Sequence, residues 1–314
     1  MDEQVGGNDS WELPRAAELV ERLEHPAGVL RVVVDTDTDN EIDDQFAVAY
    51  ALLSPERLRV EALYAAPFHN ERSVGPEDGM VRSYDELRRV VERVGGHDGP
   101  VLRGSRRLLP DAVTPVESDA AHDLVERAAA EDGPLYVVAI GAVTNVASAL
   151  LLDPSIRERM VVVWLGGNPT TWHTAAEFNL AGDVAASRVL FDSGVPLVHV
   201  PCLNVAEHLR TSQAELDRFV RPCGAVGAFL AENFDAYVPD RFAATRPIWD
   251  LAPLAWLVDA AWVPTVVRSS PILTSELTWS IDPRRHPMRE AIGVDRDRVF
   301  ADLFRKLAAH AAAG

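Results

Sequence analysis

The chain has 314 residues and carries 30 lysine and arginine residues against 48 aspartate and glutamate residues, for a formal net charge of −18. This acidic balance argues against a nucleic-acid backbone as a partner, and no run of about 18 apolar residues is present that could span a membrane. The two cysteines provide no disulfide framework, and the N-terminus shows no basic start followed by an apolar run, so a cytoplasmic protein is expected.

Strands and helices are predicted to alternate along the first two thirds of the chain. The β-branched run at 30–34 predicts a buried strand, which an acidic loop separates from a helix at 45–53. Further strands are expected at 58–66, 100–102, 134–140, 160–165 and 196–200, and further helices at 81–94, 120–130, 144–152 and 185–192. This alternation predicts an α/β fold, Rossmann-like, with a mostly parallel central sheet flanked by helices.

The chain after residue 206 is expected to be mainly helical until a hairpin at 272–281. No linker or repeat divides the chain. We therefore expect an N-terminal extension at 1–29 and a single domain at 30–314.

Three chemically informative segments follow predicted strands. They are the acidic loop 35–44, the segment beginning at Gly141, and Gly166-Gly167-Asn168. Ligands of open parallel sheets bind outside the carboxyl ends of the strands, so these segments are expected at one edge of the sheet.

The loop 35–44 contains five aspartates and one glutamate but no lysine or arginine. Mutual repulsion at a few ångströms costs several kcal/mol unless a cation offsets it, and carboxylate oxygens favour Ca²⁺ or Mg²⁺. An EF-hand is excluded, because Asn40 and Phe46 stand where its glycine and glutamate belong. Two alternatives stay open at this point: a Mg²⁺-dependent phosphatase of the haloacid-dehalogenase type, based on Asp35-Thr36-Asp37, and a solvated loop whose aspartates cap a helix.

Four motifs in order resemble the landmarks of the inosine–uridine nucleoside hydrolase family. They are Asp35-Thr36-Asp37 with Ile42-Asp43-Asp44-Gln45-Phe46-Ala47; the segment from Val138 to Ala147; Ala176-Glu177-Phe178-Asn179 with Asp183; and Ile248-Trp249-Asp250-Leu251. The resemblance implies one α/β domain that hydrolyses the N-glycosidic bond of ribonucleosides to ribose and free base. It also implies a Ca²⁺ ion that holds the attacking water and the ribose diol, and a homodimer or homotetramer.

By this resemblance, Asp44 and Asp250 are carboxylate ligands of Ca²⁺, and the backbone carbonyl of Ile140 is a third ligand. A further ligand, which also acts as the general base, is Asp37. Asp39 stays an alternative, because the gap before Asp43-Asp44 is two residues longer than in the family pattern. Asp35 is expected to support the loop from behind.

The same resemblance implies the substrate contacts. Asp43 is expected at the ribose 2′-hydroxyl, Glu177 and Asn179 at the other hydroxyls, and Asn70 and Asn168 as additional ribose contacts. Thr144 and Asn145, in contrast, are expected to cap the helix that they begin.

Trp249 departs from the family pattern, in which histidine protonates the leaving base. An indole has no usable acid and can only stack or donate one N–H bond, so Trp249 is expected to bind the base. Candidates for leaving-group activation or base contact are His69, Trp172, His173, Tyr237 and Arg241, and the segment 75–80 is a candidate lid. A non-catalytic nucleoside- or riboside-binding relative is the further alternative.

Overall fold

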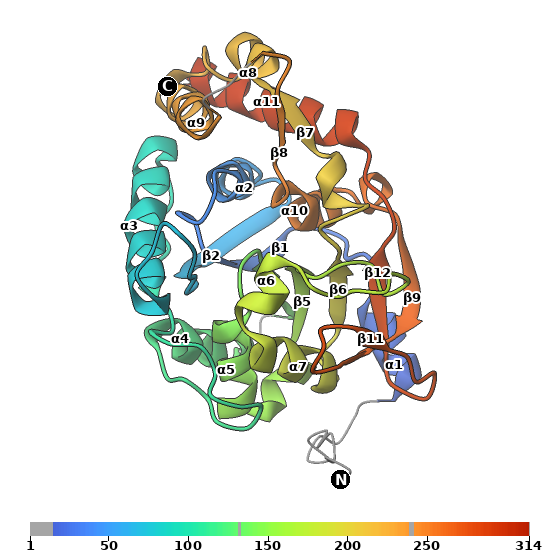
Figure 1. Cartoon of the computed structure of the whole chain (residues 1–314). Coiled ribbons are helices and arrows are strands. Elements are labelled where there is room, and N and C mark those ends of the chain that lie inside the picture. The colour runs from blue at the N-terminus through green and yellow to red at the C-terminus, as the bar shows by residue number, and fades with distance from the viewer. Residues whose placement is uncertain (1–14, 131–132, 239–241, 314) are drawn as a thin grey trace.

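The structure is a computed structural model that describes residues 15–130, 133–238 and 242–313, and its centre is an eight-stranded sheet (Figure 1). The strand order is β3-β2-β1-β4-β5-β6-β12-β9, and every neighbouring pair is parallel except the edge pair of β12 and β9. The strands are β1 (Leu30–Thr36), β2 (Leu58–Ala65), β3 (Val101–Arg103), β4 (Leu135–Ala139), β5 (Met160–Leu165), β6 (Leu197–Val200), β9 (Thr265–Ser269) and β12 (Pro287–Ala291). The predicted single-domain α/β fold with a mostly parallel sheet is confirmed.

Helices cover both faces of the sheet, and the strands alternate their side chains between two buried cores. Val32 and Val34 of β1 point into one core, and Val33 points into the other. This period of two with apolar residues on both faces is why the strand reads as a continuous apolar run. The first core packs on α2 (Asp43–Leu52), α3 (Pro76–Val94) and α10 (Leu251–Val258), and the second on α4 (Asp119–Ala129), α5 (Thr144–Leu152) and α7 (Val184–Asp192).

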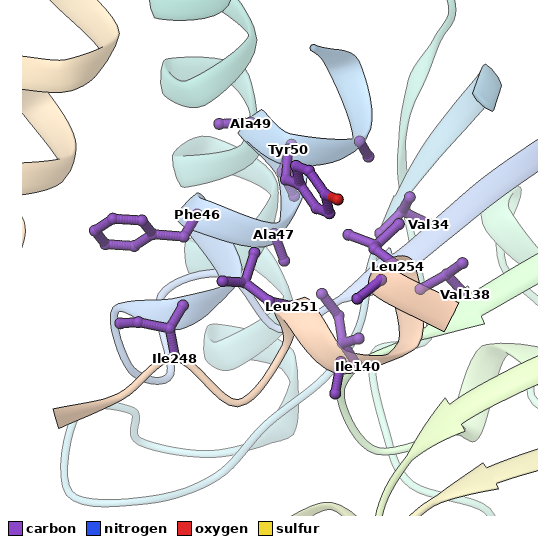
Figure 2. Packing of buried hydrophobic residues seen from close by; sticks show 14 of the residues in the cluster. Val34, Phe46, Ala47, Ala49, Tyr50, Val138, Ile140, Ile248, Leu251 and Leu254 are labelled. Carbon is purple, nitrogen blue, oxygen red and sulfur yellow. The ribbon is translucent and has the colours of Figure 1, made fainter. Parts of the chain in front are cut away.

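Helix α10 lies against α2 in the first core, although the two are about 200 residues apart in the sequence. Figure 2 shows Leu251 and Leu254 of α10 beside Phe46 of α2 and Ile140 at the end of β4. Burying such apolar side chains contributes roughly 1.5–3 kcal/mol each. This packing fixes the starts of both helices, where the acidic residues Asp43, Asp44 and Asp250 stand.

The C-terminal third contains predicted helices and the predicted hairpin, and it adds strands that the sequence pattern does not predict. Strands β9 and β12 extend the sheet, and α8 (Gln213–Phe219), α9 (Gly224–Tyr237) and α11 (Arg296–Ala313) pack together outside α2 and α3 (Figure 1). The predicted hairpin is present as β10 (Ile272–Leu273) paired with β11 (Trp279–Ser280). A further small sheet pairs β7 (Arg210–Ser212) with β8 (Thr245–Pro247). The short elements are α6 (Phe178–Gly182), η1 (Pro154–Glu158), η2 (Ala206–His208) and η3 (Ala260–Trp262).

The segment 75–80 is not the lid loop that the sequence suggests. Pro76 begins α3, and a Cβ added at Gly79 would lie 2.0 Å from the carbonyl oxygen of Phe68. The first turn of α3 is therefore packed directly on the backbone that leads away from β2, which leaves it no room to act as a loop.

The N-terminal segment also forms structure where it is described. Helix α1 (Ala16–Arg22) buries Leu19, and Glu24 after it pairs with Arg289 of β12 at 2.6 Å. The division of the chain at 29/30 stays a prediction. Among the described residues, no helix combines the length and the apolar character needed to cross a membrane.

Candidate functional site

A cavity of about 280 Å³ opens at the carboxyl edge of the sheet, where the motifs of the sequence meet. The walls come from the loop after β1, the ends of β4 and β5, the segment after β6 and the stretch that leads into α10. The described lining residues are Asp37, Asn40, Glu41, Asp43, Asp44, Ile140, Leu165, Asn168, Ala176, Glu177, Phe178, Asn179, Cys202, Leu203, Arg246, Trp249 and Asp250. The position is the one expected for a ligand of a parallel sheet.

Buried carboxylates form the floor of this cavity. Asp43, Asp44 and Asp250 each offer an oxygen, and these atoms all lie within 4.8 Å of one another. Burial raises the pKa of Asp44 to about 7, and burial together with repulsion from Asp43 and Asp44 raises that of Asp250 well above its usual range. Carboxylates held this close inside a protein are the hard oxygen donors that suit a divalent cation.

Asp37 and Asp39, the two candidates for the general base, lie on different sides of the loop. Asp37 is buried in the cavity wall, and its Oδ2 has no hydrogen-bond partner. Burial, then repulsion from Asp44 and Asp43, raises its pKa. Gly141 makes room for it, because a Cβ at this glycine would lie 2.9 Å from the Asp37 Cγ.

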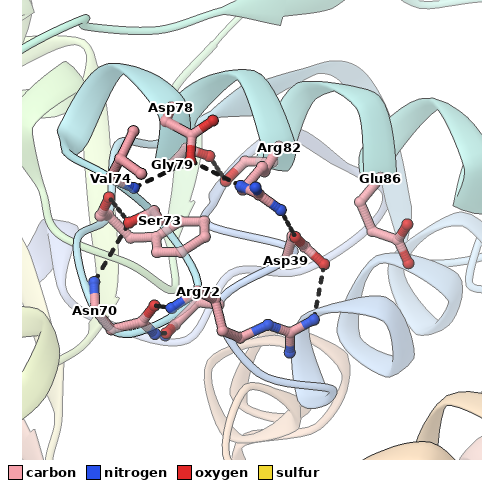
Figure 3. Close-up of polar contacts among 12 residues, drawn as sticks. Asp39, Asn70, Arg72, Ser73, Val74, Asp78, Gly79, Arg82 and Glu86 are labelled. Carbon is pink, nitrogen blue, oxygen red and sulfur yellow. Dashed lines mark hydrogen bonds and ion pairs between the residues drawn. The ribbon is translucent and has the colours of Figure 1, made fainter.

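Asp39 instead faces α3 and does not line the cavity. Figure 3 shows it between two arginines: Arg72 Nη2 lies 3.1 Å from Asp39 Oδ1, and Arg82 Nη1 lies 3.7 Å from Oδ2. Both arginines come from the 70–82 region rather than from the acidic loop. Asp39 therefore pairs with two arginines, whereas Asp37 forms no ion pair among the described residues, and the charges that raise its pKa are other carboxylates.

A layer of hydrogen bonds holds the floor from behind. Thr36 Oγ1 donates to Asp44 Oδ1 at 2.5 Å, and Asn145 Nδ2 donates to Asp35 Oδ1 at 2.7 Å. The expectation that Asn145 caps α5 is wrong, because its side chain ties Asp35 to the backbone N–H of Ser105. Thr144 likewise donates to Asp183 instead of capping the helix. From the sequence, Asn145 looks like an ordinary helix-capping residue. In the structure it instead links the end of β1 to the segment after β3.

Glu177, Asn179 and Asn168 form one wall, and the protein fixes the orientation of each. Glu177 caps α6 and accepts hydrogen bonds from the backbone N–H groups of Gly167 at 2.7 Å and Asn179 at 3.1 Å. Asn179 Nδ2 donates to the carbonyls of Leu165 and Ile140. Asn168 Nδ2 donates to the Ala176 carbonyl, which leaves its buried Oδ1 without a partner.

The mouth of the cavity contains residues that the sequence analysis did not identify. Arg246 of β8 pairs with Glu41 at 2.9 Å, and Trp249 stands nearby as expected. Asn40, Phe178, Cys202 and Leu203 complete the additions. No local signal identifies Arg246, because the pairing of β8 with β7 is what carries it to the cavity.

Several expected contacts lie elsewhere. Asn70 does not line the cavity but donates from Nδ2 to Asn40 Oδ1 at 2.6 Å, one residue behind the wall. His69, whose Nδ1 lies 3.3 Å from Ser73 Oγ, and Trp172 and His173 are also absent from the lining. Tyr237 contacts Arg246 through its hydroxyl group. Arg241 lies outside the described residues.

Comparisons with known proteins agree with one another. The family model described as "Inosine-uridine preferring nucleoside hydrolase" matches residues 32–301. A probable uridine nucleosidase of Arabidopsis thaliana is 27% identical over 66% of this chain and 69% of its own length. The pyrimidine-specific ribonucleoside hydrolase RihA of Salmonella paratyphi A is 29% identical over 76% and 83%, respectively.

Solved structures show the same fold. A plant nucleoside hydrolase superposes with a TM-score of 0.71 at 22% identity, over 89% of this chain and 99% of that one. A purine-preferring ribonucleoside hydrolase from Gardnerella vaginalis gives a TM-score of 0.69 at 20% identity, over 90% and 100%.

Proposed function

Because this chain belongs to the inosine–uridine preferring nucleoside hydrolase family and is therefore an N-glycosyl hydrolase, we propose that it uses the cavity at the carboxyl edge of its sheet to hydrolyse a ribonucleoside with Ca²⁺ as cofactor. The observation that carries the proposal is the group of buried carboxylates at the floor. Asp43, Asp44 and Asp250 converge from two helix starts, and within the described chain none of the three forms an ion pair with an arginine, lysine or histidine.

The donors at the floor fit a hard divalent cation. In the proposal Asp37, Asp44, Asp250 and the carbonyl oxygen of Ile140 hold the ion, with Asp43 close enough to contribute or to face the ribose. The Ile140 carbonyl accepts one long hydrogen bond from Asn179, and a carbonyl oxygen has a second lone pair to offer. When bound, calcium supplies positive charge that offsets these carboxylates and makes a neighbouring water more acidic.

The side chains of the chain itself provide the remaining chemistry. Asp37 Oδ2, which has no hydrogen-bond donor, accepts the proton of the attacking water. Asp43, Glu177, Asn179 and the Asn168 Oδ1 bind the ribose hydroxyls and fix the ring. The anionic wall then stabilises the positive charge that develops on the sugar as the glycosidic bond breaks.

The test is a panel of ribonucleosides assayed with Ca²⁺ present or chelated and scored for free ribose. We expect ribose release that chelation abolishes and added Ca²⁺ restores. Asp37→Asn is expected to lower kcat by about 100-fold or more, whereas the matched variant Asp39→Asn, which removes the same charge outside the cavity, stays within a few-fold of wild type.

The two alternative functions predict different results. Release of phosphate from phosphate esters, without ribose release from nucleosides, would indicate the phosphatase. Riboside binding without turnover, in a protein that still takes up Ca²⁺, would indicate the binding protein. Equal losses in Asp37→Asn and Asp39→Asn would contradict the assignment of the base.

A further inference from the structure

Among the residues that the structure describes, none at the mouth of the cavity is suited to protonate the departing base. Its described lining residues include no histidine, lysine or tyrosine, and Arg246 is the cation among them. Cys202 is unsuited as an acid, because burial and the neighbouring Glu177 raise the pKa of its thiol well above the usual range. A guanidinium does not lose its proton in proteins, so Arg246 offers charge and N–H bonds rather than a proton.

Arg246 is held rigidly from one side. Its Nη2 donates to Glu41 Oε2 at 2.9 Å and to the Tyr237 hydroxyl oxygen at 3.0 Å, and its guanidinium carbon lies 4.7 Å from the centre of the Tyr237 ring. Glu41 comes from the loop after β1 and Tyr237 from the end of α9. Two segments far from β8 in the sequence therefore hold this side chain in place, whereas an arginine that only faces solvent is usually not held in this way.

Two of the three guanidinium nitrogens, Nε and Nη1, make no hydrogen bond within the described chain. The buried Nε has no hydrogen-bond partner, and both bonds that Arg246 makes within the described chain use Nη2. A buried N–H without an acceptor is unfavourable, and a ligand atom that accepts its hydrogen bond removes that cost. The N–H groups available to a ligand are thus those of Nε and Nη1, on a residue that lines the cavity.

The two ends of the cavity differ in burial in a way that orients a nucleoside. The floor carboxylates Asp44 and Asp250 are almost fully buried, whereas the side chains of Arg246 and Glu41 are 34% and 31% exposed. The carboxylates attract the sugar, which becomes positive as the bond breaks, and the cation attracts the part that becomes negative. The base therefore lies towards Arg246 and Trp249.

Resting on the proposed function, we propose that Arg246 is a catalytic residue that stabilises the departing base as an anion. When the bond between C1′ and the base nitrogen breaks, its electron pair passes to the base and settles on a carbonyl oxygen next to that nitrogen. One N–H group of Arg246, that of Nη1 or that of Nε, donates to this oxygen. Water forms the new bond to C1′, its proton goes to Asp37, and the base takes a proton from solvent after it leaves. The chemical class of substrate is a riboside whose base carries such a carbonyl oxygen.

A pair of substrates with different leaving groups tests this role. Uridine needs help to expel its base, whereas 4-nitrophenyl β-D-riboside expels a phenolate that is already a stable anion. Arg246→Met is expected to lower kcat on uridine by about 100-fold, the loss typical for one donor to a developing anion, and to lower kcat on the nitrophenyl riboside less than about fivefold. Guanidinium ions at millimolar concentration should restore part of the uridine activity.

A control variant shows whether the effect of Arg246→Met comes from the loss of a positive charge alone or from the loss of its contact with the base. Arg284→Met removes the same charge from an exposed arginine paired with Asp282, and it should leave both substrates unaffected. Thermal denaturation and Ca²⁺ uptake, measured on Arg246→Met, show whether that variant folds with its floor intact, and the conservative Arg246→Lys should keep part of the uridine activity.

Equal losses on both substrates, or an unchanged uridine rate, would overturn the role of Arg246 while the proposed function stands. A wild-type protein that releases ribose from neither substrate, with Ca²⁺ present, would overturn the proposed function itself and this inference with it.

Discussion

Replacing Asp44 by asparagine is expected to stabilise the metal-free protein while it abolishes turnover. Asp44 is buried beside Asp43 and Asp250, and Thr36 donates a hydrogen bond to its Oδ1. An asparagine of the same shape keeps an oxygen for Thr36 and removes one negative charge from the floor. Comparing the two metal-free proteins therefore measures how much the Asp44 charge lowers the free energy of unfolding when no cation is bound.

The magnitude follows from the pKa of Asp44, which burial raises from its ordinary value of 3.8 to about 7. Each tenfold change in acidity corresponds to about 1.4 kcal/mol, so ionising Asp44 at pH 8 costs the folded state about 4 kcal/mol. Between pH 4 and pH 7 the folded chain holds a proton that the unfolded chain has released. The free energy of unfolding of metal-free wild type therefore falls as the pH rises through this window. In Asp44→Asn the part of this fall that comes from Asp44 should be absent.

Urea unfolding of chelator-treated protein at pH 5 and pH 8 measures the effect. We expect Asp44→Asn to exceed wild type by up to about 4 kcal/mol at pH 8 and by clearly less at pH 5. Added Ca²⁺ should raise the stability of wild type by about 2.7 kcal/mol at 100 times its Kd, and leave the variant unchanged.

Asp282→Asn serves as the control, because Asp282 is a partly exposed aspartate outside the cavity that is paired with Arg284, and its replacement should give no such gain. A metal-free Asp44→Asn protein less stable than wild type at pH 8, or one that Ca²⁺ still stabilises fully, would refute the reasoning.

Three further changes test other parts of the site. Trp249→Ala should raise KM for a nucleoside about fivefold with a smaller effect on kcat, since aromatic stacking contributes about 1 kcal/mol. Steady-state kinetics measure this, and a near-normal variant would show that Trp249 only packs. Glu290→Gln should lower both Tm and kcat/KM. Buried Glu290 accepts a hydrogen bond from the Thr170 N–H at 3.0 Å and lies 3.6 Å from His199, which contacts the carbonyl of Gly166, two residues before Asn168. A lowered Tm with full activity would show that Glu290 stabilises the fold without supporting the site. Burial opposes ionisation of Glu290, but the nearby His199 ring and the hydrogen bond from Thr170 outweigh it and lower the pKa of Glu290 to about 2. The stability that this carboxylate contributes should therefore disappear as the pH falls from about 4.5 towards 2, as acid unfolding of wild type and Glu290→Gln would show.

The sequence by itself determined the sheet centre and the edge at which the site lies. The apolar runs of β1, β4 and β5 are buried on both faces, so their composition alone identifies them as strands. The parallel order then brings the segments after them together, as predicted. The motifs around Asp44 and Asp250 carry enough local pattern to identify the family, which the family model confirms.

Strands β9 and β12 could not be predicted from the local sequence pattern. They are short segments that become strands by pairing with each other and with β6, about 90 residues earlier in the chain. Strand propensity depends on such partners more than on the residues themselves. For this reason β9 lies in a region that was predicted to be mainly helical, and no element was predicted at β12.

Only the tertiary structure decided which acids of the loop face the cavity. Asp37 and Asp39 are two residues apart and chemically identical, but Arg72 and Arg82 pair with Asp39 and leave Asp37 among carboxylates. The structure likewise brings Arg246 to the mouth of the cavity through the pairing of β8 with β7. In both cases the deciding partner lies tens of residues away or more, and the energy of a charge depends on what surrounds it in space. The sequence determines which charged residues are present, and the fold determines which of them lie close together.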